Sequence, residues 1–324
     1  MRFFVLGVGS IGVRHIRNLQ SLGFTDIIAY DANAESLKKI SDDLGIKTAG
    51  SLPGGIAERP DAALVCLPNH LHIDASIELA MAGIHLFIEK PLDLSLARVD
   101  ELIALIEQKS LIDMVACNFR FDAGLRMMKE RMENGSIGRI LRLQASFGQY
   151  LPDWRPSTDY RKNYAAKKET GGGVILDRIH EFDYVHWLMG TVASISGYAS
   201  RIGDLEIETE DNADVIYRHT TGAVSNIHVD YLRREYQCSC EVSGSEGIMV
   251  WNFKQRSLLQ FEASNKQWTD LSADIPADIN DMYVKELKYF TDCVASRNTT
   301  FNTVVNAAEV LRTVLITKEM IVQS

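Results

Sequence analysis

The chain has 324 residues, of which 46% are hydrophobic and 24% charged, and its formal net charge is -9. This length exceeds one ordinary hydrophobic core and favours two domains. The acidic balance argues against non-specific binding to nucleic acid or to an anionic membrane, because both are negatively charged. The five cysteines include no C-x-x-C pair, so we expect no metal site and a reducing, cytoplasmic setting. The apolar run at 3–8 is too short for a signal segment or a membrane span.

The first 120 residues alternate between two periodicities. Apolar runs typical of strands buried on both faces occur at 3–8, 26–30, 61–67, 84–89 and 111–118. Helical spacing of apolar residues is found at 11–22, 35–44, 73–83 and 93–108. This alternation predicts βαβ units and a doubly wound parallel sheet over residues 1–120.

The pattern changes after residue 120. Helices are expected at 122–133, 174–189, 281–295 and 304–321, and a strand at 139–149. From 191 to about 270, short strands alternate with glycine turns, as in an open, predominantly antiparallel or mixed sheet. This pattern predicts a second, α+β domain over residues 121–324, whose last helix could pack back on the first domain.

A G-x-G-x-x-G motif, Gly7, Gly9 and Gly12, follows the first strand and opens a helix. In such a motif the first glycine makes the tight turn, the second lets a pyrophosphate approach the backbone, and the third lets helix and strand pack closely. The helix N-terminus offers free N–H groups and a positive dipole end to the phosphates. We therefore predict that residues 1–120 bind a dinucleotide, although a glycine-rich turn without a ligand is the plainer alternative.

Two further segments lie where this dinucleotide would extend. Asp31 ends the second strand, where a carboxylate accepts hydrogen bonds from both ribose hydroxyls and repels a 2′-phosphate; it favours NAD over NADP unless it is a plain turn residue. The segment CLPNHLH (66–72) follows the next apolar strand, and ligands of open α/β sheets lie beyond the carboxyl ends of strands. His70 and His72 could contact the cofactor or cap the next helix.

Five motifs in chain order, GVGSIG, LPNHLH, EKP, CNFRF and GGGVILDRIHEFD, make most of the chain resemble the glucose–fructose oxidoreductase / inositol dehydrogenase / MocA family. The resemblance implies a Rossmann domain and a carboxyl-terminal α/β domain whose open sheet often serves for oligomerisation. It also implies hydride transfer between NAD(P) and a carbinol of a sugar, cyclitol or nucleotide sugar. We expect a homodimer or homotetramer with a small sugar-type substrate and NAD, and neither a nucleic-acid nor a membrane partner.

The resemblance makes Lys90 of EKP the catalytic lysine, rather than part of a surface turn. Its ammonium could stabilise a developing alkoxide, while Glu89 tunes that charge or holds the ribose. Pro91 stiffens the turn, and a cis bond is possible there. Asp177 and His180 are three residues apart and would share a helix face. We predict His180 as the general base, unless it is a core or capping histidine, and Asp177 as its partner or a sugar ligand. The family commonly spaces these two residues by four, which leaves the role of Asp177 open.

The connection 154–173 is basic and aromatic and ends in three glycines, which permit close approach of the backbone to a ligand. It is interpreted either as a solvated face or as a cover over the nicotinamide pocket, where aromatic rings stack on a sugar and guanidinium groups bind phosphate or carboxylate. The second interpretation favours an anionic substrate, namely a nucleotide sugar, sugar acid or sugar phosphate, over a neutral cyclitol. A non-catalytic dinucleotide-binding regulator or scaffold is the alternative from another functional class.

The complete set of predicted site residues follows from these motifs and the resemblance. The catalytic residues are Lys90, His180 and Asp177. The cofactor contacts are Gly7, Gly9, Ser10, Ile11, Gly12, Asp31, Leu67, Pro68, Asn69, His72, Glu89, Lys90, Asn118, Tyr160 and Arg161. The substrate contacts are Lys90, Arg120, Trp154, Tyr164, Asp177 and His180.

Overall fold

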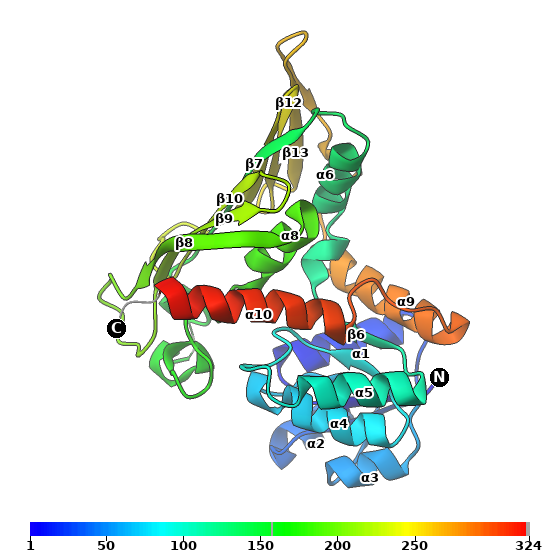
Figure 1. Cartoon of the computed structure of the whole chain (residues 1–324). Coiled ribbons are helices and arrows are strands. Elements are labelled where there is room, and N and C mark those ends of the chain that lie inside the picture. Colours follow the sequence, from blue (N-terminus) through cyan, green and yellow to red (C-terminus); the bar gives the residue numbers. More distant parts are fainter. Residues whose placement is uncertain (157, 322–324) are drawn as a thin grey trace. The chain divides into compact units, whose positions relative to one another are not determined.

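A computed structural model describes residues 1–156 and 158–321. The chain forms two compact units (Figure 1): Met1–Asn118 with Asn280–Leu311, and Phe119–Ile279 with the chain from Arg312 onward. The first unit therefore contains α9 (Asn280–Ser296) and the beginning of α10 (Val304–Ile321). In the described ranges, no helix combines the length and the apolar character needed to cross a membrane.

The first unit is built on a six-stranded parallel sheet of order β3-β2-β1-β4-β5-β6. Its strands are β1 (Phe3–Leu6), β2 (Ile27–Tyr30), β3 (Lys47–Thr48), β4 (Ala62–Val65), β5 (His85–Ile88) and β6 (Asp113–Val115). Every residue of β1, β4, β5 and β6 is buried, as the unbroken apolar runs of β1 and β4 require. The predicted doubly wound sheet is confirmed.

Helices connect these strands: α1 (Ser10–Ser21), α2 (Ala34–Leu44), α3 (Leu52–Ala57), α4 (His72–Met81) and α5 (Val99–Lys109). The chain runs from β1 to β2 in one direction and from β4 to β5 in the other, so right-handed crossovers place helices on both faces of the sheet. The short β3 and α3 were not predicted. Helix α5 begins six residues later than expected, because the backbone at Arg98, directly before it, is left-handed (φ 60°) and cannot continue a right-handed helix.

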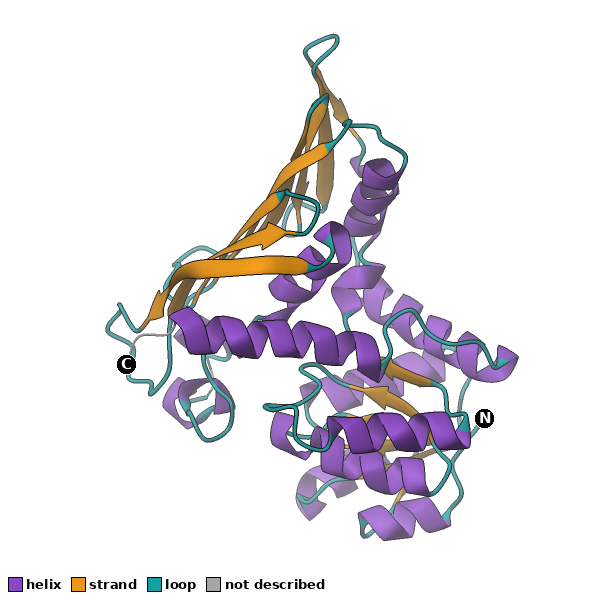
Figure 2. Cartoon of the chain, viewed as in Figure 1, coloured by secondary structure: helices purple, strands orange, loops and turns teal. Residues whose placement is uncertain are grey.

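The second unit contains an eight-stranded mixed sheet of order β14-β13-β12-β11-β7-β10-β9-β8. Its strands are β7 (Ile140–Gly148), β8 (Val192–Ser200), β9 (Asn212–His219), β10 (Val224–Asp230), β11 (Gln237–Gly244), β12 (Gly247–Asn252), β13 (Ser257–Glu262) and β14 (Gln267–Asp270). Only β7 and β10 pair in parallel. Helices α6 (Ala123–Glu133), α7 (Val174–Asp177) and α8 (Ile179–Met189) lie along one side of the sheet (Figure 2). This confirms the expected second sheet.

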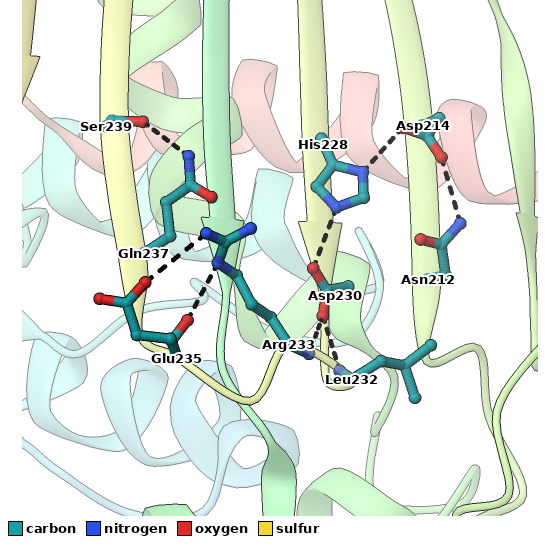
Figure 3. Close-up of polar contacts among 9 residues, drawn as sticks. All are labelled: Asn212, Asp214, His228, Asp230, Leu232, Arg233, Glu235, Gln237 and Ser239. Atoms are coloured by element: carbon teal, nitrogen blue, oxygen red, sulfur yellow. Dashed lines mark hydrogen bonds and ion pairs between the residues drawn. The ribbon is translucent and has the colours of Figure 1, made fainter.

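The other side of the large sheet carries a polar network (Figure 3). On β10, Ile227 and Val229 point to the helices and are buried, whereas His228 points the other way and is partly exposed. The His228 ring lies between two carboxylates, with Nδ1 2.7 Å from Asp214 and Nε2 2.9 Å from Asp230. These hydrogen bonds, that of Asp230 first, raise the pKa of His228. The strand alternation thus separates an apolar, helix-covered face from a polar, open face.

Candidate active site

The glycine loop after β1 has two kinds of glycine. At Gly7, where φ is 90°, an added Cβ would lie 2.4 Å from the Cys66 carbonyl oxygen, and at Gly12 it would lie 1.9 Å from the Gly7 oxygen. These two glycines are required by the fold itself. At Gly9 an added Cβ would meet nothing within 4 Å, and φ is an ordinary −66°. The protein therefore does not need a glycine at Gly9 for its own packing, which fits a backbone that a ligand approaches closely.

The start of α1 adds hydrogen-bond donors to this loop. The first intrahelical bond runs from the Val13 N–H to the Gly9 carbonyl at 3.0 Å, so the amides of Ser10 and Ile11 precede the helical ladder. Both residues lie at least partly at the surface. Free amides and the positive end of the helix dipole suit a pyrophosphate, so the residues present fit a dinucleotide.

Asp31 follows β2 and is held by two backbone amides. Its Oδ2 accepts from the Val8 N–H at 2.7 Å and its Oδ1 from the Asn33 N–H at 2.8 Å. The contact to Asn33 is the turn role that we left as an alternative. Each carboxylate oxygen has two lone pairs, so the turn leaves capacity for further hydrogen bonds. The partly exposed carboxylate therefore remains suited to the ribose, and its contact with NAD stays a prediction.

The loop after β4 contains Leu67, Pro68 and Asn69, all at least partly exposed. His72 behind them is only 1% exposed, with Nε2 2.8 Å from the Leu67 oxygen and Nδ1 2.9 Å from the Pro91 oxygen. Burial lowers the pKa of His72. Its side chain makes no capping hydrogen bond to α4, and its contact with the cofactor stays a prediction. His72 links the loop after β4 to the turn after β5.

The EKP turn follows β5, and its Lys90–Pro91 peptide is cis. The Glu89 side chain is buried, with Oε1 2.7 Å from His15 Nε2, while Oε2 accepts from the Lys90 N–H at 3.2 Å. Burial alone opposes ionisation, but the His15 hydrogen bond, together with the charge of Lys90, outweighs it and lowers the pKa of Glu89. A carboxylate fixed in this way suits the interpretation in which Glu89 tunes the charge at Lys90 rather than holding the ribose.

Asn118 ends the first unit, just beyond β6. Its side chain is buried, with Nδ2 3.7 Å from the Met282 sulfur. Its Oδ1 has no hydrogen-bond partner among residues 1–156 and 158–321. An unsatisfied buried acceptor at the carboxyl edge of the sheet is compatible with the predicted cofactor contact, which stays a prediction.

In the second unit, the predicted helix 174–189 is broken. Helix α7 ends at Asp177 and α8 begins at Ile179, because Arg178 leaves helical geometry (φ −99°, ψ 36°). The prediction that Asp177 and His180 share one helix face is therefore wrong. The guanidinium of Arg178 instead pairs with Glu181 at 2.9 Å and lies 3.4 Å from the centre of the Phe147 ring.

Asp177 is buried and is a hydrogen-bond acceptor for two tyrosines. Tyr164 donates to its Oδ1, and Tyr231 donates to its Oδ2 at 3.0 Å. Burial first, and the neighbouring Asp177 charge second, raise the pKa of both tyrosines, so they stay hydroxyl donors. The His180 ring is partly exposed, and its centre lies 5.0 Å from that of Phe119. The catalytic roles of Asp177 and His180 stay predictions.

The predicted substrate contacts divide into two groups. Arg120 is buried and forms a two-pronged ion pair with Asp183, at 2.9 and 2.7 Å. The ion pair gives Arg120 a role in the core of the second unit, and its contact with substrate stays a prediction. Trp154 stands edge-on against Tyr231, with ring centres 5.4 Å apart, and Tyr164 is partly exposed. Tyr164 and Tyr231 contact the Asp177 carboxylate and Trp154 packs on Tyr231, and the predicted roles of Trp154 and Tyr164 in stacking on a sugar stay predictions.

The predicted Tyr160–Arg161 pair lies in a short 3-10 turn, η4 (Tyr160–Lys162). The Arg161 guanidinium is 2.8 Å from Asp159 and 3.2 Å from Glu206, and the Tyr160 hydroxyl accepts from the Glu206 N–H at 3.2 Å. The charge of Arg161 is thus largely matched within its own unit. Its contact with the cofactor stays a prediction. The triple glycine likewise has a packing reason, since an added Cβ at Gly172 would lie 2.5 Å from the Ala165 oxygen.

Sequence reasoning missed two residues of these sites. His15 was taken only as part of a helical pattern, yet it is fully buried and holds Glu89. Tyr231 lies in the segment that was predicted only as short strands, without the hydrogen bond to Asp177. A histidine on the apolar face of α1, three residues after Gly12, was the available signal for the first. The second depends on a contact across 54 residues and had none.

Comparisons with known proteins agree with this geometry. Residues 1–117 match the oxidoreductase family with an NAD-binding Rossmann fold, and residues 125–250 match the GFO/IDH/MocA C-terminal domain. The chain is 32% identical over 310 residues to the myo-inositol 2-dehydrogenase of Thermotoga maritima, covering 91% of this chain and 89% of that protein. It is 25% identical to the scyllo-inositol 2-dehydrogenase (NAD(+)) of Bacillus subtilis, covering 95% and 90%.

Among solved structures, a levoglucosan dehydrogenase in complex with NADH and L-sorbose matches with a TM-score of 0.89. The match covers 99% of this chain and 96% of that one at 19% identity, a likeness that shows the fold alone. The inositol dehydrogenase of Thermotoga maritima, by contrast, is similar in sequence along nearly its whole length. The chain belongs to the Gfo/Idh/MocA family of NAD(P)-dependent oxidoreductases.

Proposed function

We propose that the protein is an NAD-dependent dehydrogenase or reductase that acts on a secondary carbinol of a cyclitol or sugar ring. One observation carries the proposal. The open glycine position after β1 and the Glu89–Lys90 turn after β5 lie at the same carboxyl edge of one parallel sheet. Dinucleotides bind across that edge, at the point where the strand order reverses, here between β1 and β4.

The chemistry requires a proton to move together with a hydride. NAD, when bound, supplies the hydride acceptor. As a carbinol is oxidised its hydroxyl proton must leave, and His180 is the proposed base. The ammonium of Lys90 stabilises the oxygen as it gains negative charge, and the fixed carboxylate of Glu89 keeps a compensating charge beside that ammonium. Asp177, held by two tyrosine hydroxyls, orders the aromatic cluster beside it.

The preference for NAD over NADP rests on Asp31. Two backbone amides hold its carboxylate at the end of β2, where it would repel a 2′-phosphate. We expect wild-type protein to bind NADH more tightly than NADPH, as followed by nicotinamide fluorescence. Asp31→Ser should reduce the difference in affinity between NADH and NADPH, because it removes the negative charge. Tighter NADPH binding by the wild type would contradict the assignment.

Two substrate classes are compatible with the second unit. A neutral cyclitol is supported by the similarity to two inositol dehydrogenases. An anionic sugar is supported by a different observation: the exposed Arg234 lies 3.6 Å over the Tyr150 ring, and the charge of nearby Arg155 acts against the rise in the pKa of Tyr164 that burial causes. Guanidinium groups presented by aromatic rings are suited to phosphate or carboxylate.

The test is turnover on a panel of cyclitols, neutral sugars, sugar acids, sugar phosphates and nucleotide sugars with NAD or NADH. Lys90→Ala and His180→Ala should each lower kcat on the active substrate by roughly 10²–10⁴-fold, because positioned proton transfer contributes about that much. NAD affinity should stay within a few-fold. If no member of the panel turned over while NAD still bound, the non-catalytic regulator would be the better assignment.

We also propose that the open face of the large sheet pairs with a second copy of the chain. Ile216 on β9 is 44% exposed there, beside the polar network of Figure 3, and a sheet covered on one side leaves a face to be solvated or paired. Light scattering at micromolar concentration should give a dimeric or tetrameric mass, and Ile216→Lys should reduce it. A monomeric wild type would refute this proposal.

A further inference from the structure

The glycine-loop helix carries a buried histidine that none of the proposed chemistry uses. His15 lies one turn into α1, and its side chain is fully buried. Its ring packs edge-on against Phe87 of β5 and Tyr283 of α9, with ring centres 5.2 and 6.3 Å away. Three elements therefore fix the imidazole in one place, and from that place Nε2 reaches Glu89 at 2.7 Å.

The hydrogen-bond pattern determines which form of His15 fits this pocket. Nδ1 is buried and has no hydrogen-bond partner in the described part of the chain. An imidazolium would leave a buried N–H without an acceptor at Nδ1, whereas the neutral form with its proton on Nε2 leaves only an unused lone pair. The neutral tautomer donates to Glu89 and adds no charge. The pair therefore keeps the full negative charge of the carboxylate.

That negative charge has one positive neighbour at hand. The titratable groups around Glu89 are His15, His72, Lys90 and the Cys66 thiol. Burial keeps the pKa of His72 low, and burial followed by the Glu89 charge raises the pKa of Cys66, so both stay neutral near pH 7. Arg14 on the same helix lies over the Tyr283 ring, 4.4 Å from its centre. The charge of Glu89 is therefore directed at Lys90, whose own N–H it also accepts.

We propose that His15 is a positioning residue for Lys90, which, by donating to Glu89, fixes the turn after β5 and ties it to the helix that binds the pyrophosphate. The inference rests on the proposed function in taking Lys90 as catalytic and α1 as the helix that binds the pyrophosphate. In this proposal the N-terminus of α1 contacts the phosphates, and His15 in its first buried turn holds Glu89. The same helix therefore fixes the position of Lys90 relative to the cofactor.

Two substitutions at His15 separate hydrogen bonding from packing. His15→Gln keeps an N–H donor at nearly the distance of Nε2, and His15→Leu fills the pocket without a donor. We expect His15→Leu to lower kcat by roughly 10- to 100-fold, since small displacements of a reacting group have costs of that order, with KM for NAD changed less than about three-fold. His15→Gln should restore kcat to within a few-fold of wild type. Ile16→Val, a buried change on the same helix, is the control for packing alone.

A second readout does not depend on knowing the substrate. The lysines are reductively methylated with ¹³C-formaldehyde, and the Lys90 resonance is assigned by its loss in Lys90→Arg. We expect this resonance to shift in His15→Leu and in Glu89→Gln at fixed pH, and to stay near its wild-type position in His15→Gln and Ile16→Val. If it shifted in this way but no carbinol turned over, the proposed function would fail and the positioning role would stand.

Three results would overturn the inference. The Lys90 resonance could be the same in every variant while only the melting temperature changed, which would make His15 a packing residue. His15→Leu and His15→Gln could lower kcat equally, which would exclude a role for the hydrogen bond that His15 donates. If His15→Leu failed to fold, His15→Gln and Glu89→Gln would decide, and an unshifted Lys90 resonance in Glu89→Gln would refute the link.

Discussion

The two glycines Gly9 and Gly12 are predicted to respond oppositely to the same added methyl group. At Gly9 the Cβ would enter open space at φ −66°, a conformation that alanine adopts freely, so Gly9→Ala should leave stability within about 0.5 kcal/mol of wild type. The methyl group would instead occupy the approach of the pyrophosphate. A forced methylene typically costs about 1–3 kcal/mol, so NAD should bind roughly 5- to 150-fold more weakly.

Gly12→Ala is the matched control. Its Cβ would lie 1.9 Å from the Gly7 carbonyl oxygen, a backbone atom that cannot rotate away. The helix must move from the strand by more than an ångström, so we expect a loss of at least about 1–3 kcal/mol and a melting temperature lower by roughly 3–10 °C. Calorimetric titration with NAD and thermal unfolding measure the two effects separately. If Gly9→Ala bound NAD like the wild type, the loop would not be the pyrophosphate site and the proposed orientation of the dinucleotide would be wrong.

Two further predictions concern buried charges. Removing either partner of the Arg120–Asp183 ion pair, as in Arg120→Met or Asp183→Asn, should cost about 3–5 kcal/mol in urea unfolding, because the remaining charge is buried and loses this partner. A raised KM for substrate with unchanged stability would instead support the predicted substrate contact of Arg120. Burial raises the pKa of Asp113 to about 6, against a hydrogen bond from the Val304 N–H. The folded state then holds a proton that the unfolded chain releases near pH 4, so stability falls by up to about 3 kcal/mol as pH rises from about 4 to 6. Asp113→Asn keeps an acceptor for the Val304 N–H but cannot titrate, so its unfolding free energy should not fall over this pH range. If urea unfolding gave the wild type and Asp113→Asn the same dependence on pH, the raised pKa of Asp113 would be contradicted.

The periodic part of the sequence predicted the fold because burial imposes the period. Strands buried on both faces must be apolar throughout, so β1 and β4 were visible as unbroken runs. The two-residue β3, whose residues are exposed, left no such pattern. At Arg178 the pattern was present but the predicted element was wrong. The helical spacing of apolar residues continues across Arg178, yet the helix is broken there between α7 and α8. Arg178 forms an ion pair with Glu181, and the spacing of apolar residues does not reveal such a break.

The sequence predicted where motif residues lie but not their hydrogen-bond partners, for one physical reason. A motif specifies that a side chain lies near a site, but its hydrogen-bond partners come from distant parts of the chain. Arg120 stands in a motif, yet its partner Asp183 is 63 residues away. The two ring nitrogens of His72 likewise lie 2.8 and 2.9 Å from backbone carbonyls of two loops, and the neutral ring donates to one of them.

Two buried histidines, His15 and His72, connect parts of the first unit that are distant in sequence. The loops after β1, β4 and β5 are joined to one another by side chains rather than by strand pairing. His15 connects α1 to Glu89, and His72 connects the loop after β4 to Pro91. Both histidines are buried, so each hydrogen bond is shielded from water and its loss would leave a polar group unsatisfied. The proposed phosphate site and catalytic lysine would need such ties to stay at a fixed separation, because loops are more mobile than the strands that they connect. The two histidines are therefore expected to matter more for kcat than for cofactor affinity.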